Sequence, residues 1–151
     1  MQYSIGVEYA FHSLFYMIDL PEHKTISIKD IAKLHGLTET YLSKIFSKLR
    51  KAGIVRSIAG VKGGYELARG AENISFWDII EAIEGTSHLF NCIEIRKKNI
   101  FVNDASIFTD KCPCLIKTVI QEAEDLMRNH LKTKSLRWLY EQVYKDFSEE
   151  K

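Results

Sequence analysis

The stretch TETYLSKIFSKLRKAGIVRSIAGVKGGYELA, residues 38–68, decides the fold. Thr38 is a residue type that caps helix N-termini, and Gly53 is a type that ends helices in the left-handed conformation. Between them the apolar residues recur with helical spacing, at Leu42, Ile45, Phe46 and Leu49. After Gly53 the chain alternates as a strand, a glycine-rich tip and a second strand. We therefore predict a helix followed directly by a β-hairpin.

A shorter helix precedes this stretch. The run KDIAKLHGL, residues 29–37, has apolar residues on one side and ends in a turn at Gly36. Two helices joined by a glycine turn are typical of a helix-turn-helix, and a hairpin after the second helix is typical of a wing. The sequence thus predicts a mainly α fold with a small β-wing, in which the second helix enters the major groove of DNA.

The charge of the chain is concentrated in the same place. The net charge is only +1, but residues 40–65 contain six basic side chains and no acidic one, so the remaining residues carry −5. A solvated helix face is the commoner explanation of such a run. This run coincides with the predicted helix and hairpin, so it favours an electrostatic surface for the phosphates of nucleic acid.

We expect the outward side chains of the second helix and the hairpin to contact DNA. Hydroxyl and lysine side chains suit a mixture of phosphate and base-edge contacts, and glycines let backbone approach a phosphate. The predicted contact residues are Thr38, Thr40, Tyr41, Ser43, Lys44, Lys48, Arg56, Lys62, Gly63 and Gly64. Tyr41 fits a half-buried core position equally well. The outer face of the helix lacks Arg and Asn, so we expect modest direct base readout.

Three further helices are predicted. Ser75 and Asp78 resemble a capping box before a helix that ends at Gly85. A helix of four to five turns begins at Leu115 and carries a long apolar seam, and a final amphipathic helix follows, with Leu136 and Leu139 on its apolar face. The seam predicts a homodimer, and a two-fold symmetric dimer would read a palindromic operator in double-stranded DNA.

This order of elements predicts three parts: a winged helix-turn-helix domain over residues 1–85, a sensor loop with cysteines over 86–114, and a long C-terminal dimerisation helix with the final helix over 115–151. The first twenty residues lack a basic leader, and no apolar run is long enough to cross a bilayer. We therefore expect a cytoplasmic protein without a membrane partner, in which thiols stay reduced.

All three cysteines, Cys92, Cys112 and Cys114, lie in the predicted sensor loop. A reduced cysteine cluster indicates metal binding or redox chemistry. A thiol oxidoreductase would place such a pair within alternating β and α elements, which are not predicted here, and no catalytic triad or P-loop is apparent. We therefore predict that the chain is not an enzyme. A winged helix that binds protein is the other alternative, which the basic run disfavours.

Residues 38–69 and the run ISFWDIIEAIEG, residues 74–85, resemble the Rrf-two family of bacterial winged-helix transcription regulators. The resemblance covers nearly the whole chain. It implies a dimeric DNA-binding regulator, usually a repressor, in a family in which many members sense iron–sulfur status, nitric oxide or thiol metabolites. The family wing often carries Arg-Gly-Pro-Gly before the Gly-Gly-Tyr. Here residues 59–62 read Ala-Gly-Val-Lys, so Lys62 or Arg56 has to replace the minor-groove arginine.

The resemblance also implies a ligand set for a cluster of the 2Fe-2S type. Cys92 occupies the first cysteine position of cluster-binding members, but the other two cysteines arrive late and close together. Glu8 and His12 are four residues apart on the predicted first helix and share a face. Together with Cys92 and Cys112 of the partner subunit, they would supply four ligands across the dimer interface. Operator binding would then respond to redox or iron–sulfur status.

Other interpretations of the same residues remain. Cys92, Cys112 and Cys114 could form a thiol switch without metal. A second interpretation is a structural zinc held by the three cysteines and His88, and a third is that the cysteines are inert. His12 on an aromatic-rich helix is more often a core histidine, and Glu8 is more often solvated.

Overall fold

The computed structural model describes residues 2–21, 24–86, 88–101, 103–108 and 112–149. Its contacts divide the chain into two units. The winged-helix unit comprises Gln2–Thr86 and Leu131–Lys151, and the cysteine unit comprises Ser87–His130. The three-part division expected from the sequence stays a prediction. No helix in the described part of the chain is long and apolar enough to span a membrane.

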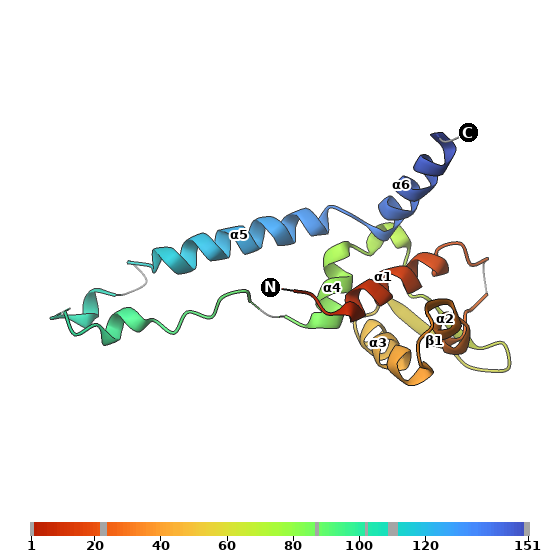
Figure 1. Cartoon of the computed structure of the whole chain (residues 1–151), viewed down its shortest axis with the longest axis horizontal. Helices are drawn as coiled ribbons and strands as arrows, with labels where there is room; N and C mark the ends of the chain where they lie inside the picture. Colours follow the sequence, from red (N-terminus) through yellow and green to blue (C-terminus); the bar gives the residue numbers. More distant parts are fainter. Residues whose placement is uncertain (1, 22–23, 87, 102, 109–111, 150–151) are drawn as a thin grey trace. The chain divides into compact units, whose positions relative to one another are not determined.

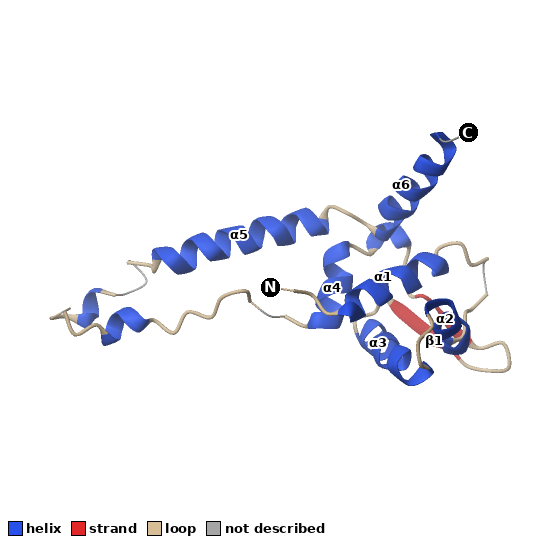
Figure 2. Cartoon of the chain, in the orientation of Figure 1, coloured by secondary structure: helices blue, strands red, loops and turns tan. Residues whose placement is uncertain are grey.

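The winged-helix unit is mainly helical, with one small sheet (Figures 1 and 2). The two strands pair antiparallel, with Val55 opposite Leu67. The elements of this unit are α1 Ile5–Met17, α2 Ile28–His35, α3 Glu39–Lys51, β1 Val55–Ile58, β2 Gly64–Leu67, η1 Ala71–Asn73, α4 Phe76–Glu84 and α6 Leu136–Glu149. The predicted fold class is confirmed.

Local capping explains where these helices begin and end. The Thr38 side chain accepts a hydrogen bond from the backbone N–H of Tyr41, and Ser75 with Asp78 forms both hydrogen bonds of a capping box. Gly36 and Gly53 follow α2 and α3 with φ of 64° and 69°. These positive φ values suit glycine, so both turns place α3 at a fixed angle between α2 and the hairpin.

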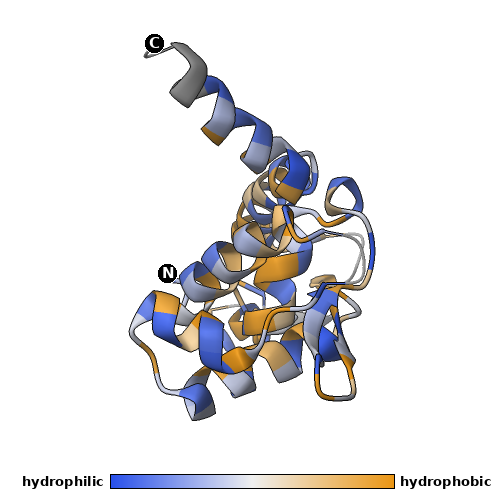
Figure 3. Ribbon diagram, turned by 90° about the vertical axis from the view of Figure 1, so that its right-hand side faces the viewer, coloured by the Kyte–Doolittle hydropathy of each residue, from blue (hydrophilic) through white to orange (hydrophobic). Residues whose placement is uncertain are grey.

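The core of the winged-helix unit lies where α1, α2, α3 and α4 meet. Phe46 of α3, Leu14 of α1 and Ile79 of α4 are fully buried in one hydrophobic cluster. Hydrophobic and hydrophilic residues alternate along these helices (Figure 3), as expected for helices with one covered face. The backbone N–H of Leu136 donates to Ile74 at 2.8 Å, which ties the start of α6 to the segment before α4.

The cysteine unit contains two short 3₁₀ helices, η2 Ile95–Lys98 and η3 Ala105–Ile107, and most of α5, Leu115–Lys132. The 18 residues of α5 match the predicted length. One side of α5 holds the loop, because the buried carboxylate of Glu124 accepts hydrogen bonds from Leu89 N at 3.2 Å and from Arg128 at 2.9 Å. Another side leaves four apolar side chains 62–75% exposed, at Leu115, Ile116, Val119 and Leu126.

Candidate nucleic-acid interface and cysteine site

The outward face of α3 is polar and open. Thr40, Ser43 and Lys44 are exposed on α3, while the apolar residues of the same helix are buried against the core. Thr38 lies at the N-terminus, where its hydroxyl also caps the helix. This arrangement leaves hydroxyls and one ammonium group available to a ligand that approaches α3 from solvent. Their contact with DNA stays a prediction.

Two predicted contact residues of α3 have partners within the protein. The ring of Tyr41 is 37% exposed and meets the ring of Tyr9 edge to face, with the ring centroids 6.1 Å apart. The ammonium group of Lys48 donates to the carbonyl of Ile83 at 2.7 Å, near the C-terminus of α4. Tyr41 thus remains exposed while its ring contacts Tyr9, and both alternatives for it stay open. Lys48 binds a helix end whose dipole favours a cation.

The hairpin contains an ion pair that a count of charges over residues 40–65 does not reveal. Arg56 Nε lies 2.6 Å from Oε1 of Glu66, directly across the two strands. Glu66 is the first residue beyond the basic run. Including Glu66 and Glu39, residues 39–66 hold six basic and two acidic side chains, a net charge of +4. Lys44 and Lys62 therefore become the principal predicted phosphate contacts.

The glycines of the hairpin are required by its own packing. A Cβ at Gly63 would lie 2.4 Å from the carbonyl oxygen of Ile58, and a Cβ at Gly64 would lie 2.6 Å from that of Ile26. The hydroxyl of Thr25 also donates to the carbonyl of Lys62 at 2.8 Å. The tip is therefore hydrogen-bonded to the segment before α2, and the side chain of Lys62 is exposed.

The cysteine unit brings Cys92 and Cys114 together. Both line a cavity of about 330 Å³ whose walls include Phe90, Ile93 and Ile116. Cys112, which was expected to join Cys92 in the ligand set, is exposed and is not among the residues that line the cavity. All three thiols are free.

Cys114 immediately precedes the first turn of α5. The backbone N–H of Lys117 lowers the pKa of the Cys114 thiol, with smaller contributions in the same direction from the N–H of Ile116, the charge of Arg96 and the Cys92 thiol. Partial burial opposes them by raising the pKa. The local surroundings therefore favour the thiolate form of Cys114.

Arg96, which the sequence analysis did not single out, is fixed beside the two thiols. Its Nε and Nη2 donate to the two carboxylate oxygens of Glu94, the latter at 2.8 Å, and its Nη1 donates to the carbonyl of Cys112 at 3.1 Å. The hydrogen bond from Arg96 lowers the pKa of Glu94. Glu94 has a φ of 53°, the one positive φ of a non-glycine residue in the described ranges. The fork of hydrogen bonds holds the guanidinium in one orientation.

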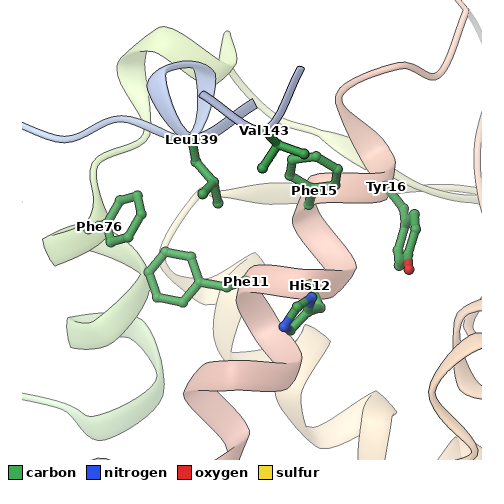
Figure 4. A pocket seen from close by; sticks show the side chains of 7 residues that line it. All are labelled: Phe11, His12, Phe15, Tyr16, Phe76, Leu139 and Val143. Atoms are coloured by element: carbon green, nitrogen blue, oxygen red, sulfur yellow. The ribbon is translucent and has the colours of Figure 1, made fainter. Parts of the chain in front are cut away.

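The other two predicted metal ligands lie on α1. Glu8 is exposed, and His12 is four residues further along the helix. Figure 4 shows His12 among the side chains that line an apolar groove of about 390 Å³ between α1, α4 and α6. The His12 ring also packs against the ring of His35, with the centroids 6.3 Å apart.

The donor set within one chain does not fit an iron–sulfur cluster. Such a cluster takes four protein ligands, whereas the cavity offers two thiols. Among the described residues, no three His, Cys, Asp or Glu side chains gather in a way that could hold a metal ion. The set of Glu8 and His12 with Cys92 and Cys112 of the partner subunit stays a prediction. The zinc alternative needs all three cysteines and His88, whereas the cavity contains only Cys92 and Cys114 of these residues.

His35 at the end of α2 was not selected from the sequence, where its neighbours are Leu34 and Gly36, because the fold alone brings the rings of Tyr9 and Tyr16 close to it. Its Nε2 lies 3.1 Å from Ser13 Oγ, which itself donates to the carbonyl of Tyr9 at 2.6 Å. The serine proton is thus used, and His35 donates through Nε2. Burial lowers the pKa of His35 from its ordinary value of 6.5, and the neighbouring His12 lowers it further.

This lowered pKa predicts that the fold loses stability in mild acid. Well above pH 6.5 His35 is neutral in both the folded and the unfolded chain. As the pH falls below 6.5, the unfolded chain binds the proton first, which favours unfolding. We expect the melting temperature of His35→Gln to fall less than that of the wild type between about pH 7.5 and about pH 5.5. His130→Gln, at an exposed position, is the control, and equal pH profiles for wild type and His35→Gln would contradict the prediction.

The chain is similar to known proteins over most of its length. Residues 3–142 match the model of the family Rrf2, described as "Iron-dependent Transcriptional regulator". The chain is 34% identical over 127 residues to "Protein rrf2" of Nitratidesulfovibrio vulgaris, covering 80% of this chain and 76% of that protein. It is 28% identical to "HTH-type transcriptional regulator NsrR" of Shouchella clausii, covering 82% and 77%. The crystal structure of the oxidized form of Staphylococcus aureus CymR superposes with a TM-score of 0.66 and 29% identity, covering 93% and 97%.

Proposed function

The chain belongs to the Rrf2 family of DNA-binding transcriptional regulators, and we propose that it is a homodimeric repressor whose operator affinity responds to the redox state of its loop cysteines. The observation that carries the proposal is the cavity shared by Cys92 and Cys114, in the same chain as a winged helix. The family and the relative from Shouchella clausii are described as transcriptional regulators, in agreement with the prediction that the chain is not an enzyme.

The DNA-binding part of the proposal rests on α3 and the hairpin. The open face of α3 presents hydroxyls and Lys44, and the hairpin tip presents Lys62. A helix of this width fits the major groove, and the adjacent tip reaches the neighbouring phosphates. Because so few side chains reach base edges, the shape of the operator contributes to its recognition.

The homodimer part rests on α5. Glu124 lies on the side of the helix that holds the loop of its own chain, whereas Val119 and Leu126 lie on a side that no described residue covers. Burial of apolar side chains of this size is favourable, and a second copy presents the same exposed stripe, defined by Leu115, Val119 and Leu126 of α5. Pairing two stripes by two-fold symmetry would hold two winged helices at a fixed spacing on one duplex.

The redox part rests on the position of the thiols. The cavity couples the loop at Cys92 to the first turn of α5 at Cys114. A covalent bond between these two points would fix the loop against the dimerisation helix and so change the spacing of the two winged helices. CymR of Staphylococcus aureus was crystallised in an oxidized form. This supports a redox role for a protein with this fold.

Operator affinity before and after thiol oxidation tests the proposal. We expect fluorescence anisotropy on a duplex selected with reduced protein to show a change of about 5- to 150-fold after oxidation with diamide, the usual range for coupled sites. Cys92→Ser should abolish the response, and Cys112→Ser should retain it. Equal affinities of the reduced and oxidised wild type would contradict the redox proposal.

Anaerobic reconstitution of the same protein distinguishes the thiol switch from the predicted cluster. We expect protein reconstituted anaerobically with iron and sulfide to remain colourless after desalting, and to keep its response to diamide. Protein that holds iron and sulfide, and loses its colour in both Cys92→Ala and His12→Ala, would instead support the ligand set across the dimer interface. Iron and sulfide counts on the desalted protein decide between the two.

A further inference from the structure

The cavity around the two thiols has the features of a reaction site, a role that goes beyond a structural disulfide. Phe90, Ile93 and Ile116 give it apolar walls, and its volume of about 330 Å³ falls in the range of small-molecule sites. Ile93 and Ile116 are 75% and 65% exposed, so the cavity is open to small molecules from solvent.

The two thiols in this cavity are not equivalent. Cys114 immediately precedes α5, whose first backbone N–H groups have no partner within the helix, and the N–H groups of Lys117 and Ile116 lower the pKa of its thiol. Cys92 lies in the loop before η2 and lines the same cavity. Donors that converge on one sulfur stabilise negative charge on it, so Cys114 is the better nucleophile at neutral pH.

Arg96 supplies a fixed positive charge at the same place. Its guanidinium is held by both carboxylate oxygens of Glu94 and by the carbonyl of Cys112, and it also lies over the ring of Phe108 at 4.7 Å. An oriented guanidinium stabilises an oxygen on which negative charge develops as a bond breaks. The site therefore combines a nucleophilic sulfur, a cation and a second thiol.

We propose that Cys114 reacts first with an organic hydroperoxide that enters this cavity, and that Cys92 then closes a disulfide with it. The proposal rests on the redox function proposed above and specifies its first chemical step. The apolar walls favour an organic hydroperoxide over hydrogen peroxide, because a hydrocarbon group gains contacts that hydrogen peroxide cannot make.

The two steps balance as follows. The Cys114 thiolate attacks the terminal oxygen of the hydroperoxide, the O–O bond breaks, and the alkoxide takes a proton to leave as the alcohol. The resulting Cys114 sulfenic acid is attacked by Cys92, an S–S bond forms, and the hydroxide leaves as water with the proton of the Cys92 thiol. Two sulfurs each lose one electron, and the hydroperoxide is reduced by two electrons.

Mass spectrometry of the reduced full chain, treated with cumene hydroperoxide in the presence of dimedone, tests the proposal. Wild type should form a Cys92–Cys114 disulfide. Cys92→Ser should accumulate one dimedone adduct on Cys114. Cys114→Ser should react at least about tenfold more slowly, and Cys112→Ser should react as the wild type does. Cumene hydroperoxide should react at least about tenfold faster than hydrogen peroxide at equal concentration.

Two results would overturn the proposal: a first adduct on Cys112 or Cys92, or equal rates with the two peroxides. Circular dichroism of each variant shows that it has folded, and a variant that has not folded is replaced by the corresponding alanine variant. Because no DNA is present, the result is independent of operator affinity. If Cys114 does not react first but diamide still changes DNA binding, the inference fails and the redox function stands.

Discussion

Reversing two charges, in the variant Lys44→Glu/Lys62→Glu, is expected to weaken operator binding by about 100-fold or more at about 0.15 M salt. A dimer would lose four phosphate contacts, and each one contributes about 0.9 to the slope of log affinity against log salt concentration. The slope should therefore become shallower by roughly 3 to 4. Both side chains are exposed, so the melting temperature should change little. Anisotropy titrations at several salt concentrations give the affinity and the slope together.

The matched control carries the same change in net charge elsewhere. Lys132→Glu/Lys145→Glu alters two exposed lysines of the winged-helix unit that lie outside α3 and the hairpin. This control should keep an affinity within about threefold of the wild type, since screening at this ionic strength removes most long-range effects. If both double variants lose affinity equally, binding follows the overall charge, and the assigned DNA-binding face is wrong.

The second large effect is expected from charges placed on the exposed stripe of α5. Val119→Glu/Leu126→Glu puts four carboxylates of a dimer at positions that are 62% and 72% exposed in one chain. Burying them in the dimer would be costly, so the variant should be monomeric. Since two linked sites gain about 10²- to 10⁴-fold over one, operator affinity should fall by about 100-fold or more. Sedimentation velocity and anisotropy measure the two consequences.

Lys132→Glu is the control for α5, because it makes the same change in net charge. By the helical repeat, Lys132 lies on the side of α5 away from Val119. The control should remain dimeric and bind DNA with the affinity of the wild type. A dimer that survives in Val119→Glu/Leu126→Glu would show that another surface joins the two copies.

The elements of the winged helix could be predicted because their signals are local. Thr38, Ser75 and Gly53 mark helix ends through interactions within a few residues, and the structure confirms each of these ends. The partners of Lys48 and Arg56 could not be predicted from local signals. These partners, Ile83 and Glu66, are 35 and 10 residues away, and a helical pattern or a charge count does not reveal such partners.

The cysteine site could be predicted only in part. The sequence indicated that the three thiols belong to one functional loop, but it left open which of them lie together. The structure places Cys92 and Cys114 in one cavity, and Glu124, which binds the backbone of Leu89, holds the loop along α5. The role of Arg96 depends on the same loop path. A spacing of about twenty residues does not fix the path of a loop.

The mass of the operator complex is the most direct test of the central claim, that two copies joined through α5 place two winged helices on one symmetric duplex. Native mass spectrometry of the reduced wild type with its selected palindromic duplex should show two chains on each duplex. A duplex that contains only one half-site should bind far more weakly. One chain on each duplex, with equal affinity for the palindrome and the half-site, would contradict the claim.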